Sequence, residues 1–89
     1  MLRITKTFED DQNIILRLDG KIINATVSDL EAVCLQYQNS GKKSVSLDFS
    51  GVTFVDNSGL ETLKKVKTRG VEMVNGSPFV ETLLGGVRE

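Results

Sequence analysis

The residues best placed to do chemistry in this sequence are Asp56 and Ser58, which stand two positions apart between a predicted strand and a predicted helix. A serine hydroxyl near a carboxylate suits three roles: a nucleophile in catalysis, an acceptor of a phosphoryl group, or a cap of a helix N-terminus. Glu61 follows Ser58 by three residues, which is the spacing of a capping box. From this spacing alone, the capping role is favoured.

Catalysis is the least favoured of the three roles. The 89 residues include no histidine, which is the usual general base of serine hydrolases and the commonest protein ligand of zinc. Ser58 does not lie in a Gly-x-Ser-x-Gly motif, and the sequence has no phosphate-binding loop and no cluster of metal ligands. We therefore expect a protein that is not an enzyme and has neither metal nor cofactor.

Hydrophobic periodicity predicts the elements that position Ser58. Alternating apolar residues predict strands over residues 2–8, 14–19, 44–49 and 71–74. Helical spacing predicts helices over residues 26–39 and 58–69, and Ser77 with Pro78 indicates the start of a last helix. A turn is expected at Ser50 and Gly51.

These elements predict one α/β domain over residues 1–89, in the order β-β-α-β-α-β-α. The first two strands are expected to form an antiparallel hairpin, and the long connection to the third strand predicts a parallel crossover. The result is a small mixed four-stranded sheet covered by three helices. The centre of the core is expected at Val45, Leu47, Phe49, Leu60 and Leu63.

The composition indicates a soluble cytoplasmic protein. Eleven basic and twelve acidic side chains leave a formal charge of -1, so no overall field attracts nucleic acid or anionic lipid. No apolar stretch has the length of a membrane span, and the N-terminal residues lack the apolar region of a secretory signal. The single cysteine, Cys34, allows no intramolecular disulfide and is expected to be buried in the first helix.

The segment SLDFSGVTFVDNSGLETL, residues 46–63, resembles the signature of the STAS family, named for sulfate transporters and anti-sigma-factor antagonists. Asp56, Ser58, Gly59 and Leu60 match that signature position by position. Residues 18–30 and 75–84 resemble the family's passage into the first helix and its entry to the last helix. The resemblance therefore covers nearly the whole chain and implies a STAS-like fold.

The resemblance also implies a function. In bacterial members the serine or threonine of the motif is phosphorylated by a partner kinase, and its modification state decides which partner is bound. Ser58 would then be the phosphorylation site, where a phosphate would meet the positive end of a helix and add about -1.5 to -2 charges to a docking surface. The implied partner-binding residues are Ile23, Asn24, Asp56, Asn57, Ser58, Gly59 and Glu61.

Two departures from the family pattern favour an alternative without phosphorylation. Ile23 occupies the place of an aspartate that is associated with kinase recognition, and Asn24 follows one position late. Glu61 replaces a residue that is usually small or apolar, and its carboxylate would repel a phosphoserine. The partner is thus either a serine kinase of the anti-sigma-factor type or the ATPase of an ABC-type lipid transporter, and homodimers are a further option.

Overall fold

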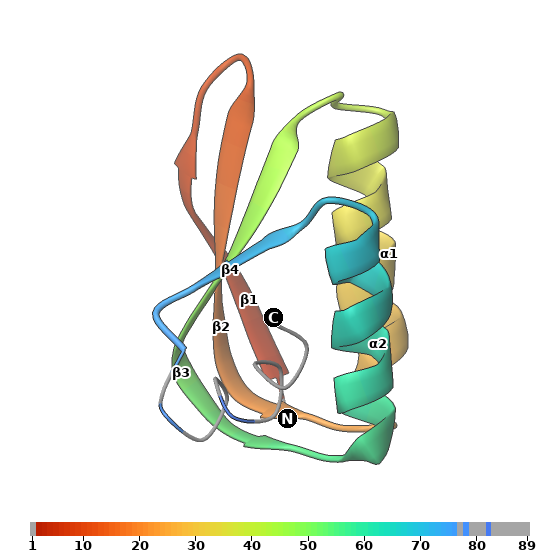
Figure 1. Cartoon of the computed structure of the whole chain (residues 1–89). Coiled ribbons are helices and arrows are strands. Elements are labelled where there is room, and N and C mark those ends of the chain that lie inside the picture. The colour runs from red at the N-terminus through yellow and green to blue at the C-terminus, as the bar shows by residue number, and fades with distance from the viewer. Residues whose placement is uncertain (1, 77, 79–81, 83–89) are drawn as a thin grey trace.

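The computed structural model describes residues 2–76, 78 and 82. Its elements, in chain order, are β1 (Leu2–Glu9), β2 (Asn13–Ile22), α1 (Val27–Asn39), β3 (Ser44–Val55), α2 (Asn57–Thr68) and β4 (Glu72–Val74) (Figure 1). These six elements follow the expected order. The described residues hold two helices, not the expected three, because the helix expected from Ser77 falls almost wholly outside them.

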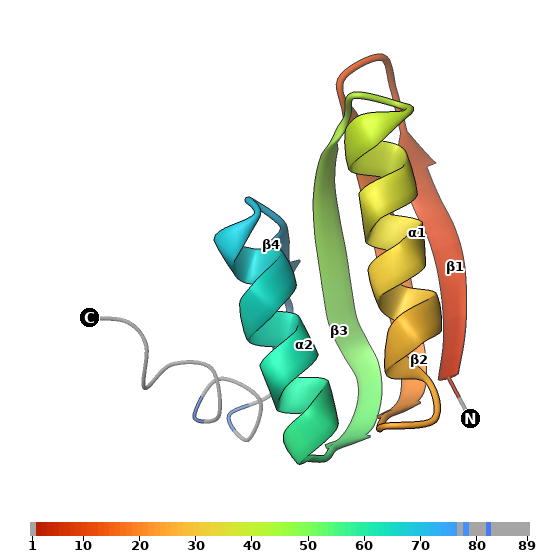
Figure 2. The ribbon, with the colours of Figure 1, turned by 90° about the vertical axis from the view of Figure 1, so that its right-hand side faces the viewer.

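The four strands form one mixed sheet in the order β1-β2-β3-β4. β1 and β2 are antiparallel, whereas the β2–β3 and β3–β4 pairs are parallel. The expected hairpin and the expected parallel crossover are therefore confirmed. Both helices cover the same face of this sheet and lie side by side (Figure 2).

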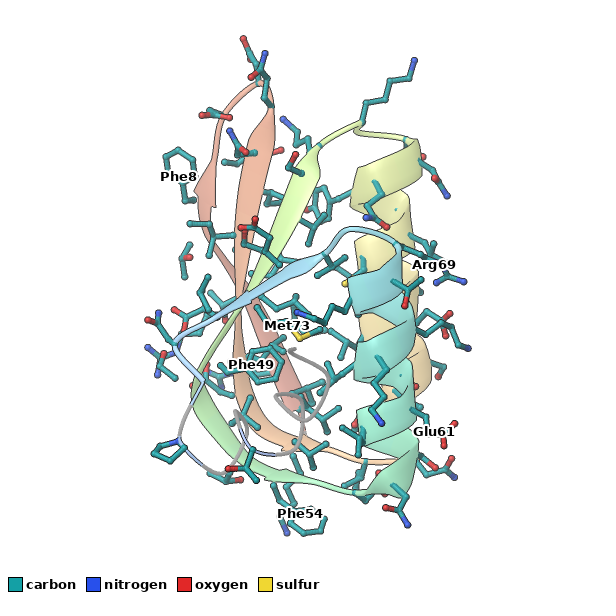
Figure 3. The ribbon with its side chains drawn as sticks, in the orientation of Figure 1. Phe8, Phe49, Phe54, Glu61, Arg69 and Met73 are labelled. Carbon is teal, nitrogen blue, oxygen red and sulfur yellow. The ribbon has the colours of Figure 1, made fainter. Side chains whose placement is uncertain are left out.

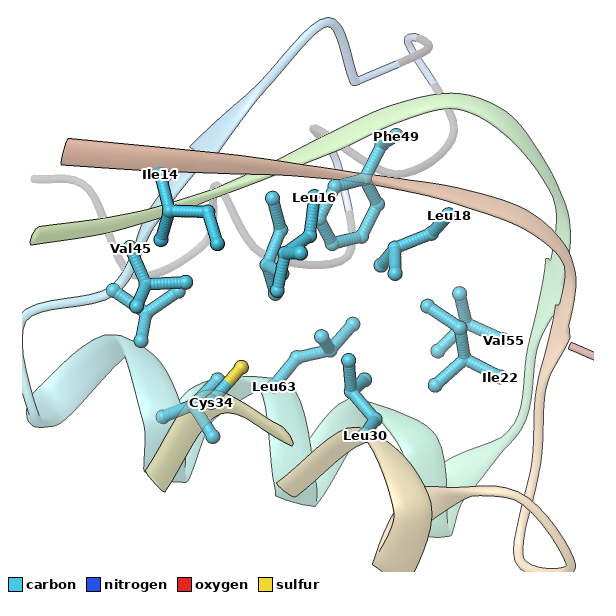
Figure 4. Close-up of a cluster of buried hydrophobic side chains, with 13 residues drawn as sticks. Ile14, Leu16, Leu18, Ile22, Leu30, Cys34, Val45, Phe49, Val55 and Leu63 are labelled. Carbon is cyan, nitrogen blue, oxygen red and sulfur yellow. The ribbon is translucent and has the colours of Figure 1, made fainter. Parts of the chain in front are cut away.

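The core lies between the sheet and the two helices (Figure 4). Alternate residues of β2 point into it because side chains in a strand project to opposite faces in turn. Thirteen apolar residues are buried there: Ile14, Leu16, Leu18, Ile22, Leu30, Cys34, Val45, Leu47, Phe49, Val55, Leu63, Val66 and Val71. Four of the five residues expected at the centre are among them, and the fifth, Leu60, is partly buried against the cluster.

The turn expected at Ser50 and Gly51 is wrong, because β3 continues unbroken to Val55. Gly51 stays opposite Asp19 of β2, next to an irregularity in the pairing of the two strands. A Cβ atom on Gly51 would lie 1.9 Å from the Asp19 Oδ1 atom and 2.9 Å from the Leu18 carbonyl oxygen. The glycine therefore makes room for the neighbouring strand and does not turn the chain.

The parallel pairing of β2 and β3 brings their carboxyl ends together. Ile22 and Val55, the last residues of the two strands, are direct partners in the sheet. Each strand leads into a helix from this edge, so the N-terminal ends of α1 and α2 lie at one end of the molecule (Figure 2). In the described part of the chain, no helix has both the length and the apolar character needed to cross a membrane.

Candidate functional site

The expected site residues come together where the connections that follow β2 and β3 meet. The backbone N–H of Asp56 donates to the carbonyl oxygen of Ile22 at 3.1 Å. The backbone N–H of Asn24 donates to the Asp56 Oδ2 atom at 3.0 Å. These two bonds hold the loop after β2 against the start of α2.

Asp56, and not Ser58, caps α2. Asp56 has an extended backbone, with φ -92° and ψ -175°, and its Oδ1 atom accepts a hydrogen bond from the Gly59 N–H at 2.7 Å. The helix begins at Asn57, so Ser58 is its second residue. The capping box expected at Ser58 and Glu61 is therefore wrong, because the carboxylate at the end of β3 already occupies the capping position.

Gly59 is buried and lies against the end of β2. A Cβ atom at this position would stand 2.2 Å from the Ile22 carbonyl oxygen, which is part of the backbone and cannot move aside easily. The same oxygen accepts the hydrogen bond from Asp56. A glycine is thus needed here for the close approach of α2 to β2, and not for an unusual backbone angle.

The loop from Ile23 to Thr26 is a tight turn held by its own hydrogen bonds. The Thr26 hydroxyl accepts from the Ile23 N–H at 3.0 Å and lies within hydrogen-bond distance of the carbonyl oxygens of Lys21 and Ile23. The Thr26 N–H donates to the Ile23 carbonyl oxygen at 2.8 Å. This turn leaves Ile23 half-buried and Asn24 exposed.

A shallow depression of about 390 Å³ lies between this loop and α2. Its lining consists of Asn24, Val27, Asn57, Ser58, Glu61 and Thr62. Four of the expected site residues, Asn24, Asn57, Ser58 and Glu61, thus line one depression, whereas Ile23, Asp56 and Gly59 do not line it. Glu61 is the one charged residue of the lining.

The backbone at the start of α2 is the part of the site that could favour a negative group. The Asp56 side chain accepts a hydrogen bond from the Gly59 N–H, and the Asp56 carbonyl oxygen accepts one from the Leu60 N–H. In the described structure the N–H groups of Asn57 and Ser58 have no protein partner. Unpaired N–H groups at a helix N-terminus favour a negatively charged group. No basic residue lines the depression, and Glu61 stands one turn further along the helix. Among residues 2–76, 78 and 82, no group of three His, Cys, Asp or Glu side chains could hold a metal ion.

Two ion pairs connect α2 to α1. The Glu31 Oε2 atom of α1 lies 3.0 Å from the Arg69 guanidinium and 3.5 Å from the Lys65 ammonium. The hydrogen bond from Arg69 is the main cause that holds the pKa of Glu31 below its usual value. Lys65, which follows Glu61 by four residues, is therefore directed toward α1 and not toward Glu61.

One exposed side chain at this end of the molecule was not among the expected site residues. Phe54 precedes Asp56 by two residues and is 46% exposed, whereas Phe49 on the same strand is 2% exposed (Figure 3). Strand alternation carried the signal, because Val55 points into the core and its neighbour Phe54 must therefore point away from it. An exposed aromatic side chain thus lies at the same end of the molecule as the polar depression.

The comparisons with known proteins agree with this fold. Residues 4–84 match the family model of the STAS domain. The anti-sigma factor antagonist SpoIIAA in its unphosphorylated form is 18% identical with a TM-score of 0.72, and the match covers 93% of this chain and 82% of that one. The Bacillus SpoIIAA in its phosphorylated form is 18% identical with a TM-score of 0.69, covering 94% and 86%.

A third solved structure is the anti-sigma-factor antagonist STAS domain from Rhodobacter sphaeroides. It is 21% identical with a TM-score of 0.64, and the match covers 83% of this chain and 86% of that one. No curated protein matches the sequence. At these identities the structural likeness establishes the fold.

Proposed function

The chain belongs to the STAS domain family, and on that premise we propose that it is a non-catalytic module that docks onto a partner protein. The docking surface is the loop at residues 23–24 together with the start of α2 at residues 56–61. The observation that carries this proposal is the double role of Asp56, which caps α2 and holds Asn24 against it. The long-range bond from Asn24 to Asp56 favours a surface that is pre-organised before a partner binds.

The first candidate partner is a cytoplasmic serine kinase of the anti-sigma-factor type. Two similar structures are named as anti-sigma factor antagonists, and SpoIIAA was solved in unphosphorylated and phosphorylated forms. Ser58 is half-buried in the depression, beside the N–H groups of Asn57 and Ser58. Phosphorylation of Ser58 would place about -1.5 to -2 charges in the docking surface and would thereby release a partner that fits the neutral hydroxyl.

The second candidate is the ATPase of an ABC-type lipid transporter, which the chain would bind as an accessory subunit without phosphorylation. Glu61 favours this candidate because its carboxylate shares the depression with Ser58 and no basic residue lines it. A phosphoserine there would meet repulsion within its own chain.

Two asparagine variants test the docking surface. The tagged chain is purified from its native cells, and bound proteins are identified by mass spectrometry. Asn57→Trp fills the depression without changing charge, and Asn39→Trp places the same bulk at the far end of α1. We expect a serine kinase or an ABC ATPase to be recovered with the parent chain and with Asn39→Trp, and to be lost with Asn57→Trp.

The same preparation separates the two candidates. A phosphoserine at position 58 in the isolated protein supports the kinase, whereas its absence together with a bound ABC ATPase supports the accessory subunit. Equal recovery of the partner by both tryptophan variants would contradict the proposed docking surface.

A further inference from the structure

We propose that Phe54 is the anchor of the docking surface and inserts into an apolar pocket of the partner protein, with a partner carboxylate at the rim of that pocket opposite Lys21. This inference rests on the proposed function, because it assigns the partner chemistry of the same surface. It adds an aromatic contact to a site whose expected residues include no aromatic side chain.

The exposure of Phe54 is one part of the argument. An aromatic ring carries a large apolar area, and single exposed apolar residues are common on protein surfaces. Phe54 and Phe8 are the two most exposed large apolar side chains of the described residues, at 46% and 47%. Exposure alone therefore does not distinguish Phe54 from Phe8.

The position of Phe54 in the fold distinguishes it from Phe8. Phe54 is the direct partner of Lys21 in the parallel β2–β3 pair, and the next pair along is Ile22 with Val55. Because Ile22 and Val55 point into the core, Phe54 and Lys21 project away from it.

Figure 3 shows the two phenylalanines at opposite ends of the molecule. Phe54 points outward at the end where α2 begins, and Phe8 lies near the opposite end. Phe54 therefore precedes Asp56 by two residues and lies at the same end of the molecule as the docking surface, whereas Phe8 is remote from it.

The chemistry of the partner follows from these neighbours. Aromatic side chains that enter apolar pockets, surrounded by polar residues that exclude water, supply most of the binding energy in many interfaces. Lys21 is exposed and forms no ion pair with any residue that the structure describes, so a carboxylate on the partner would complement it. A partner carboxylate near this surface would also repel a phosphate on Ser58, which agrees with release on phosphorylation.

Phe54→Ala and Phe8→Ala form a matched pair for the test. The affinity of each variant for the purified partner is measured by calorimetry, and the thermal midpoint of each is recorded to verify folding. We expect Phe54→Ala to weaken binding about 30-fold or more, the loss typical of an interface anchor. Phe8→Ala should change the affinity less than about twofold, because a side chain outside an interface contributes little. Lys21→Glu should also weaken binding, and the loss of affinity should be larger at low salt than at high salt.

A tryptophan reporter gives a second readout, since the sequence contains no tryptophan. The variants Phe54→Trp and Phe8→Trp are labelled with 5-fluorotryptophan, so that fluorine NMR detects this chain alone in the complex. Addition of partner should shift the resonance at position 54 and leave the resonance at position 8 unchanged.

The outcomes distinguish this inference from the proposed function. If Asn57→Trp loses the partner while Phe54→Ala binds as the parent does, the anchor is wrong and the docking surface stands. If neither variant changes the affinity, or no partner binds, both proposals are wrong. If Phe54→Ala instead abolishes self-association, or binding to phosphatidylglycerol vesicles, the ring serves a second copy or a lipid surface, and the inference is overturned.

Discussion

At the scale of single residues, Asp56 joins two parts of the site with one carboxylate. Its Oδ1 atom caps α2 through the Gly59 N–H, and its Oδ2 atom accepts from the Asn24 N–H. Replacement by asparagine separates these roles, because the side-chain oxygen can still cap the helix whereas the amide nitrogen cannot accept a hydrogen bond.

We expect Asp56→Asn to keep the helix start and release the loop, and Asp56→Ala to lose both at a cost of about 0.5–2 kcal/mol of stability. Amide hydrogen exchange followed by NMR measures this directly. The Asn24 amide should exchange faster in Asp56→Asn, while the Gly59 amide should stay protected. Asp11→Asn, in the exposed hairpin turn, is the control. An Asn24 amide that is equally protected in parent and variant would show that the bond to Asp56 does not hold the loop.

Two neighbouring positions should respond very differently to alanine. Gly59→Ala places a Cβ atom 2.2 Å from the Ile22 carbonyl oxygen, so α2 or β2 must shift, at a cost of about 1–3 kcal/mol. Ser58→Ala removes a hydroxyl that does not cap the helix and should change stability by less than about 0.5 kcal/mol. Urea unfolding midpoints compare the two variants. Similar midpoints would mean that α2 can move away from β2 at no cost.

At the scale of elements, the ion pairs of Glu31 connect the two helices and depend on pH. A pKa lowered by folding means that the ionised form stabilises the folded state. The contribution of Glu31 is therefore present above its usual pKa of 4.5 and is lost as the pH falls through the lower pKa of the folded state. The Glu31 side chain is partly exposed, so the effect should be modest and sensitive to salt.

The prediction is that the thermal midpoint of the parent falls more between pH 7 and pH 3 than that of Glu31→Gln. The pKa values of Glu9, Asp10 and Asp48 are also lowered. Both proteins contain these carboxylates, so their contributions to the pH dependence cancel in the comparison. An identical fall of the thermal midpoint in both proteins would show that the ion pairs of Glu31 do not stabilise the contact between α1 and α2.

Strand β3 is the central element of the core, and Leu47 is fully buried in it. Leu47→Ala should cost about 2–5 kcal/mol, a large share of the stability of a small domain. Val74→Ala, on the edge strand β4 and 36% exposed, should cost much less. Equal losses in chemical unfolding would contradict the central position of Leu47.

The elements that the sequence predicted best are those with a clear period and contacts close in the chain. Periodicity located both described helices and the hairpin. It predicted the wrong N-cap residue for α2. Ser58 and Glu61 have the spacing of a capping box, but the side chain of Asp56 accepts the hydrogen bond from the start of the helix. The bond between Asn24 and Asp56 joins residues 32 positions apart, and no local pattern reveals such a contact.

At the scale of the whole molecule, the direction of the strands places the site. The parallel β2–β3 pair ends at one edge, and both helices begin there on the same face of the sheet. Residues 23–24 and 56–61 therefore meet at one end, with Phe54 beside them. The opposite end carries the β1–β2 turn and the C-terminal ends of both helices (Figure 1).

The claim that this end is the docking surface is tested most directly by the NMR footprint of the partner on the isotope-labelled chain. The account predicts that amide resonances of residues 23–24 and 54–61 shift or broaden on addition of the identified partner, while those of residues 10–13 and 38–44 do not change. Perturbation of residues 10–13 or 38–44, with the resonances around Ser58 unchanged, would contradict it.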